Sequence, residues 1–243
     1  MEIMHGNPVT SASIGDEQID VIVDTGGLGV IAVSPVDLER LAVTFTGETI
    51  QRTDAAGDTF ESREFIVPEM LLGGHRFQNV KGFERIGAAG GFAGGRPVNV
   101  LGRGLLHDYT VVVDYPGGEI RLYSPDQSRS VCGPPTSELI ERDDEILAVP
   151  IESDGGRLLA LMDTGATYSF IQSDVVDSRN LSTTDQVYRT RSFRLGGRDF
   201  GPLEMVSLPI DGAPQIDAII GTNFFAGHVV CFDYRDRKFS VLD

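Results

Sequence analysis

The chain contains the same three landmarks twice, in the same order, and this internal repeat constrains its fold more than any other feature. Each copy has an apolar run ending in Asp-Thr-Gly, then a strand-turn-strand pattern around Gly-Gly, then a longer block that ends in Asp-Tyr. The landmarks lie at 19–27, 70–77 and 99–115 in the first copy and at 158–166, 193–200 and 218–234 in the second. Such a repeat indicates two copies of one structural unit.

Both copies are rich in Val, Ile, Phe and Tyr, in short runs separated by Gly-Gly, Pro-Gly and Asp-Gly pairs. This composition is typical of strands joined by hairpins. Helical signals are few, although Ser34-Pro35 has the residues of an N-cap and a first helical turn. The sequence therefore predicts an all-β fold of two related lobes, residues 1–123 and 145–243, joined by a polar linker at 124–144 that contains Gly-Pro-Pro.

The two copies differ in length between the first and second landmarks. Leu72 follows Asp24 by 48 residues, whereas Leu195 follows Asp163 by 32 residues. The first lobe thus carries about 16 extra residues, around a stretch with an Ala-Gly-Asp turn signal. We expect these residues to form a mobile hairpin at about 50–66 that the second lobe lacks.

The two Asp-Thr-Gly motifs carry the chemistry that the repeat predicts. A carboxylate is costly to bury unless it is hydrogen-bonded or paired, and two carboxylates a few ångströms apart cannot both ionise. If a pseudo-twofold axis brings Asp24 and Asp163 together, they share one proton. The ionised member can then take a proton from a water that attacks a peptide carbonyl, while the protonated member hydrogen-bonds the developing oxyanion. This chemistry requires no metal and no cofactor.

The repeat, and two stretches in particular, resemble the pepsin and retropepsin superfamily of aspartic proteases. RPVNVLGRGLL at 96–106 and DTGATYSFI at 163–171 are similar to the corresponding stretches of retropepsins. The resemblance implies two acid-protease β-barrel lobes with an active-site cleft between them. It also implies an aspartic endopeptidase that hydrolyses polypeptide substrates, with both lobes in one monomeric chain and the hairpin at 50–66 as a flap over the cleft.

Site residues follow from the resemblance position by position. Asp24 and Asp163 are the expected catalytic dyad. The expected supports of the active-site loops are Thr25 and Thr164, whose hydroxyls would bond across the lobes, and the turn glycines Gly26 and Gly165. The expected substrate-binding residues are Val98, Val100, Asp217 and Ile219. Asp217 stands at the position that matches Val98, so one half of the cleft would carry a charge.

Composition excludes several other classes of function. The formal net charge of −16 repels phosphate backbones and anionic lipids, which argues against nucleic-acid and membrane partners. No apolar run reaches 18 residues, so no membrane-spanning segment is expected. The first ten residues, MEIMHGNPVT, lack the basic and apolar regions of a signal peptide. The compartment stays open, a mature secreted or periplasmic form included.

Cysteine and histidine add little to the predicted site. The four histidines show no metal-ligand spacing. Two cysteines make no disulfide framework: Cys231 in the apolar run HVVCFDY predicts a small buried side chain, and Cys132 in a polar stretch predicts an exposed one. They could pair only if the linker folded back onto the last strand, which we do not expect.

Two other interpretations need to be weighed. A catalytically degenerate protein on the same fold, which binds peptides or acts as a scaffold, would have the same repeat. Residues 25–32, TGGLGVIA, match a dinucleotide-binding glycine pattern. However, Pro35 falls where the crossover helix would run, and that interpretation leaves the repeat unexplained.

Overall fold

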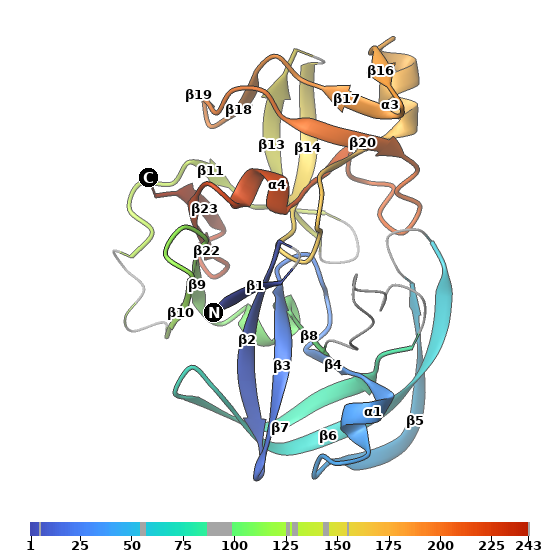
Figure 1. Ribbon diagram of the computed structural model, residues 1–243, viewed down its shortest axis with the longest axis vertical. Helices are drawn as coiled ribbons and strands as arrows, with labels where there is room; N and C mark the ends of the chain where they lie inside the picture. Colours follow the sequence, from blue (N-terminus) through green and yellow to red (C-terminus); the bar gives the residue numbers. More distant parts are fainter. Residues whose placement is uncertain are drawn as a thin grey trace.

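A computed structural model of the chain describes residues 1–4, 6–53, 57–86, 99–124, 127, 131–142, 146–154 and 156–242. Strands dominate these residues, and the helices among them are four to six residues long (Figure 1). The strands form three sheets, of which two curve into barrel-like bodies and the third lies alongside both. The predicted all-β fold class is confirmed. No helix within the described ranges is long and apolar enough to cross a membrane.

The first sheet is built from the first copy of the repeat. Its eight strands follow the order β1-β2-β3-β8-β4-β7-β6-β5, and an additional pairing of β2 with β6 closes it. The strands are β1 (Glu2–Met4), β2 (Asn7–Ile14), β3 (Glu17–Asp24), β4 (Ile31–Val33), β5 (Thr44–Thr53), β6 (Thr59–Leu72), β7 (His75–Glu84) and β8 (Asn99–Gly102). Two short helices accompany them, α1 (Pro35–Leu38) and α2 (Arg103–Leu106). Ser34 caps α1 as predicted, because its hydroxyl accepts a hydrogen bond from Asp37 N at 3.2 Å.

The second body repeats this plan with the second copy. Its path runs β16-β17-β20-β15-β21-β14-β13-β18-β19, and β12 pairs with β13. The strands are β12 (Ile140–Glu141), β13 (Leu147–Ser153), β14 (Gly156–Met162), β15 (Phe170–Gln172), β16 (Thr183–Thr184), β17 (Val187–Arg189), β18 (Phe193–Leu195), β19 (Arg198–Asp199), β20 (Glu204–Leu208) and β21 (Ala218–Ile220). Its helices are α3 (Ser173–Ser178) and α4 (Thr222–Phe225).

One parallel strand pair occurs in both bodies and positions the Asp-Thr-Gly motifs. In the first body β3 runs parallel to β8, with Asp24 opposite Gly102. In the second, β14 runs parallel to β21, with Met162 opposite Ile220. Val23 and Met162, which lie just before the two Asp-Thr-Gly motifs, are 1% exposed. Each aspartate therefore follows a strand that is anchored in the hydrophobic core.

The third sheet is shared by the two copies, which the sequence alone does not predict. It has the order β10-β9-β22-β23-β11 and contains β9 (Thr110–Asp114), β10 (Glu119–Tyr123), β11 (Ser137–Glu138), β22 (Val229–Asp233) and β23 (Lys238–Val241). Strands β9 and β22 are the equivalent last parts of the two repeat copies, and they pair antiparallel with each other. Backbone hydrogen bonds thus join the two lobes directly.

The expected linker folds back onto this sheet in its described part, which corrects the prediction for the cysteines. Thr136 N donates to Phe239 O at 2.9 Å, and β11 pairs with β23. Cys132 is buried and forms a disulfide with Cys231, with a Cα–Cα distance of 5.5 Å. The expectation that the two cysteines stay unpaired is wrong, because the path of the segment at 131–142 brings Cys132 to strand β22.

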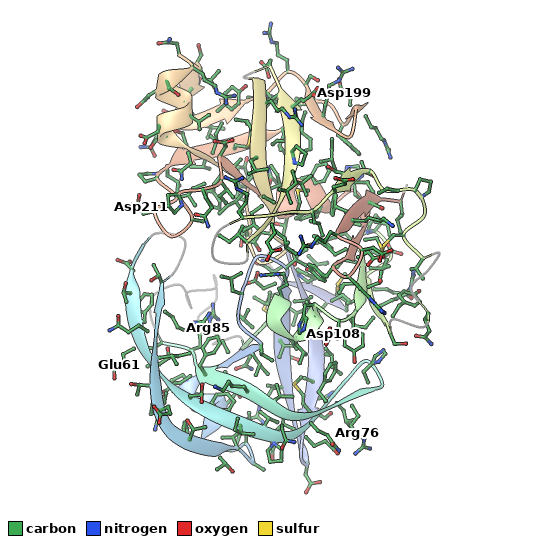
Figure 2. All side chains as sticks on the ribbon, turned by 180° about the vertical axis from the view of Figure 1, so that it is seen from behind. Glu61, Arg76, Arg85, Asp108, Asp199 and Asp211 are labelled. Carbon is green, nitrogen blue, oxygen red and sulfur yellow. A yellow bond between two sulfur atoms is a disulfide. The ribbon has the colours of Figure 1, made fainter. Side chains whose placement is uncertain are left out.

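The extra residues of the first lobe form a long hairpin. Strands β5 and β6 pair from Thr44↔Ile66 to Thr53↔Thr59, so the predicted hairpin at about 50–66 is the outer part of this element. Residues 54–56 at its turn lie outside the described residues. The hairpin curves up from the first lobe toward the second, where Asp211 lies (Figure 2). A Cβ atom on Gly57 would lie 2.9 Å from Asp211 Cβ, so the hairpin touches the opposite lobe.

Candidate active site

The two aspartates of the repeat lie face to face between the lobes. A Cβ atom on Gly26 would lie 2.5 Å from Asp163 Cγ, and a Cβ atom on Gly165 would lie 2.5 Å from Asp24 Cγ. Each motif glycine therefore leaves room for the aspartate of the opposite lobe. The sequence suggests these glycines for their turn geometry, but the structure requires them for this close approach.

Backbone amides hold both carboxylates in place. Asp24 Oδ1 accepts hydrogen bonds from Gly26 N at 2.9 Å and from Gly27 N at 2.7 Å. Asp163 Oδ1 accepts one from Gly165 N at 2.7 Å. Amide donors stabilise the ionised form of a carboxylate and restrict its orientation. The equivalent oxygens of the two aspartates are thus bound by equivalent loop amides.

Thr25 and Thr164 lock the two loops together across the lobes. Thr25 N donates to Thr164 Oγ1 at 3.1 Å, and Thr164 N donates to Thr25 Oγ1 at 3.0 Å. The Thr25 hydroxyl in turn donates to Met162 O at 2.7 Å, and the Thr164 hydroxyl donates to Val23 O at 2.6 Å. Both side chains are at most 3% exposed. Four buried hydrogen bonds with twofold symmetry therefore fix the distance between the aspartates.

Burial is the main electrostatic influence on Asp163. It raises the pKa of the Asp163 carboxyl well above its usual range, and the negative charge of Asp24 and a hydrogen bond to Asp24 raise it further. The backbone amides of Gly165 and Ala166 act in the opposite direction, with smaller effect. A carboxyl with a raised pKa keeps its proton, so this geometry favours one proton shared by the pair.

Gly102 and Gly221, which the repeat matches to each other, support the loops from below. A Cβ atom on Gly102 would strike the carbonyl oxygens of Gly29 and Gly27, and one on Gly221 would strike that of Tyr168. These contacts explain why glycine stands at the same place in both copies. The two loops therefore pass close over the strands β8 and β21.

Asn7 is a supporting residue that sequence reasoning missed. Its side chain is fully buried and donates to Thr164 O at 3.1 Å and to Gly165 O at 2.7 Å, while its Oδ1 accepts from Thr167 Oγ1 at 3.1 Å. Strand β2 of the first lobe thus holds the active-site loop of the second. Asn7 lies outside the repeat landmarks, and no motif marks it.

A cavity of about 330 Å³ adjoins the dyad and is lined by both lobes. Val100 and Ile219 line it, as expected for substrate-binding residues. Val98 lies outside the described residues. Asp217 is placed differently: its carboxylate accepts a hydrogen bond from Leu159 N at 2.8 Å, and it is not among the described residues that line this cavity. In this position Asp217 supports the backbone of strand β14.

Two arginines in the cavity were not predicted. Arg52 comes from strand β5 of the hairpin and Arg85 directly follows strand β7, and both line the cavity together with Asp24. Burial lowers the pKa of both guanidinium groups, and the charge of Asp24 opposes this effect. Neither residue belongs to the repeat landmarks, so only the folded chain reveals them.

The described residues contain no group of three or more His, Cys, Asp and Glu side chains that could hold a metal ion. The chemistry of the site must therefore be sought first in the two carboxyls and the donors around them.

Comparisons with known proteins agree with this geometry. Residues 10–103 match the family model described as aspartyl protease. Among solved structures, the aspartic proteinase from Irpex lacteus matches with a TM-score of 0.65 and 13% sequence identity, over 98% of this chain and 94% of that chain. A search of the curated proteins gives no match. The first lobe thus matches a family by sequence, and the whole chain matches a fold.

Proposed function

We propose that this chain, whose fold is that of the pepsin-like and retropepsin-like aspartic proteases, is an aspartic endopeptidase that uses Asp24 and Asp163 as its catalytic residues. The observation that carries the proposal is the mutual approach of the two carboxyls, in which each motif glycine leaves space for the opposite aspartate. Two carboxyls held in this way, with one proton between them, match the requirements of a general base and a general acid at one water.

The proposed reaction needs only groups that the chain provides. The ionised aspartate removes a proton from the water, whose oxygen attacks the carbonyl carbon of the peptide bond. The protonated aspartate donates a hydrogen bond to the carbonyl oxygen as negative charge develops there. The proton then passes to the leaving amine, and the dyad returns to its singly protonated form.

The cavity and the hairpin support a polypeptide as substrate. Apolar side chains of both lobes, Val100, Leu161 and Ile219 among them, line the cavity beside the dyad. The hairpin β5–β6 contributes Thr53 and Phe60 to the same cavity, so it would cover an extended peptide. Both halves of the site come from one chain, so one copy of the chain suffices.

The proposal is tested with the variants Asp24→Asn and Asp163→Asn. Purified protein is incubated with a denatured polypeptide across a pH series, with and without an inhibitor of aspartic proteases, and the fragments are identified by mass spectrometry. We expect cleavage by the wild type, loss of at least about 1,000-fold in kcat/KM in either variant because base or acid is missing, and full inhibition of the wild type.

Asp177→Asn is the matched control, because Asp177 is exposed on helix α3. It should cleave like the wild type, and all four proteins should show the same circular dichroism spectrum. A wild-type protein that binds peptides without cutting them at any pH would instead indicate a peptide-binding protein on the same fold.

A further inference from the structure

Arg52 lines the cavity in a position that prepares it for an anion. Its guanidinium group lies over the ring of Phe83, 3.4 Å from the ring centroid. A Cβ atom on Gly29 would lie 2.6 Å from the Phe83 ring and 3.2 Å from Arg52 Nη1, so Gly29 leaves room for this stack beside the loop of Asp24. Stacking on an aromatic face orients the guanidinium plane and leaves its N–H donors at the edge free for a ligand.

Within the described part of the chain, Arg52 makes no hydrogen bond or ion pair, and the charge that acts on it is that of Asp24. It is nevertheless partly buried under the hairpin. A guanidinium group that has lost part of its hydration is costly unless an anion compensates it. Arg85 adds a second guanidinium group to the same wall, where Figure 2 shows it on the side of the first lobe that faces the second.

The charges that line the cavity do not balance. The acidic residues of the lining are Asp24, Asp163 and Glu84. Glu84 is already paired with Arg63 outside the lining, by two hydrogen bonds of 2.7 and 2.8 Å. If the dyad carries a single negative charge, Arg52 and Arg85 leave an excess of one positive charge next to the reacting bond. This local excess contrasts with the net charge of −16 for the whole chain.

We propose that the first-lobe wall of the cleft selects a substrate with an acidic side chain, Glu or Asp, near the scissile bond, and that Arg52 and Arg85 bind its carboxylate. This proposal rests on the proposed peptidase function. Ala32, Phe60 and Val100 supply apolar surface on the same wall, against which the methylene groups of a Glu side chain can pack. A guanidinium fork matches the two oxygens of a carboxylate.

The test begins with a library of peptides cleaved by the wild type, from which the residues around each cut are counted. We expect Glu and Asp to be enriched at one position on one side of the cut. For a peptide with Glu there, kcat/KM should exceed that of its Gln counterpart by about 10-fold to 100-fold, which corresponds to a hydrogen bond with a charged partner. The ratio should fall as salt is added.

The variants Arg52→Gln and Arg85→Gln should each reduce the Glu/Gln ratio severalfold, and the double variant should bring it close to one. Arg76→Gln is the matched control: Arg76 lies on strand β7 of the same lobe, is paired with Glu69 and is not among the residues lining the cavity. This control should keep the wild-type ratio. Because the ratio compares two substrates of one protein, a change in overall activity does not affect it.

Two further arms separate the possible failures. Affinity of Asp163→Asn for fluorescent Glu and Gln peptides measures the preference without cleavage, so the preference stays testable even if no cleavage is found. Amidation of the peptide C-terminus distinguishes a side-chain carboxylate from a terminal one, and the preference should survive amidation. Equal binding and cleavage of both peptides, a preference lost on amidation, or an equal loss in Arg76→Gln would each overturn the proposal.

Discussion

Asp24 and Asp163 have different surroundings although the repeat relates them. Asp24 accepts two loop amides and lies in the same cavity as the cationic groups of Arg52 and Arg85. The pKa of Asp163 is raised by burial and then by the charge of Asp24. These surroundings favour Asp24 as the ionised member of the pair and Asp163 as the protonated one.

The pH dependence of activity follows from the sign of this shift. The active dyad has to retain one proton, and a raised pKa means that the proton is lost only when the pH rises through that higher value. We expect the alkaline limb of kcat/KM to lie well above the ordinary aspartate pKa of about 3.9, with best activity under mildly acidic conditions. The measurement uses a peptide without ionisable groups. An alkaline limb near pH 4 would contradict the raised pKa.

Gly165→Ala tests the close approach of the two aspartates. The new methyl group would lie 2.5 Å from Asp24 Cγ, so the loops must separate. We expect loss of cleavage and a decrease of about 1–3 kcal/mol in the free energy of unfolding, as for other overpacked sites. Urea denaturation and the peptide assay measure the two effects.

The matched control is Gly227→Ala, since no atom lies within 4 Å of a Cβ at Gly227. It should keep both stability and activity. If Gly165→Ala behaved like this control, the aspartates would not be as close as the structure places them.

The hairpin β5–β6 is the element with the least support from the rest of the lobe. Seven of the ten residues of β5 from Thr44 onward are exposed in an unbroken or nearly unbroken series, and the described end of the turn touches the second lobe at Asp211. Few buried contacts permit local opening at low free-energy cost. An extended peptide in the cavity would add contacts along its inner face.

Hydrogen exchange can test this role of the hairpin. We expect amides at 50–53 and 57–62 to exchange rapidly in the free protein and to become protected at least severalfold by a peptide-like inhibitor. The turn at Gly73-Gly74 between β6 and β7 serves as the internal control, because it lies outside the cavity. Unchanged protection at 50–62 would show that the hairpin is a peripheral loop.

The sequence predicts those elements that the repeat duplicates or visibly breaks. The dyad, the threonine lock and the matched Gly102 and Gly221 follow from comparing the two copies, and the hairpin follows from their difference in length. Arg52, Arg85 and Asn7 do not follow, because they lie outside the landmarks and act only once distant strands have met. Asp217 shows the limit of matching positions: the repeat aligns it with Val98, but its carboxylate binds a backbone amide of β14.

At the scale of the whole molecule, the shared sheet and the disulfide join the two lobes. Whether Cys132 meets Cys231 depends on the path of the segment at 131–142 along the sheet, and local sequence does not specify that path. The disulfide closes a loop with a sequence separation of 99 residues. A crosslink of this length restricts the unfolded chain strongly.

Removal of the disulfide should therefore lower stability. We expect the double variant Cys132→Ala/Cys231→Val to lose about 2–4 kcal/mol in the free energy of unfolding, measured by urea denaturation. The wild type in excess reductant should reach the same value, whereas reductant should leave the double variant unchanged. A wild type that is indifferent to reductant would contradict a stabilising disulfide.

The shared sheet also has a consequence for the synthesis of this protein. Strand β9 pairs with β22, and their partners Asp114 and Val229 are about 115 residues apart, which a ribosome needs roughly 6–20 s to translate. During that time the nascent chain exposes the open edge of β9, which can pair with other chains, and Asp24 has no second aspartate. A growing chain of this protein would thus need shielding by chaperones, but it could not yet digest its surroundings.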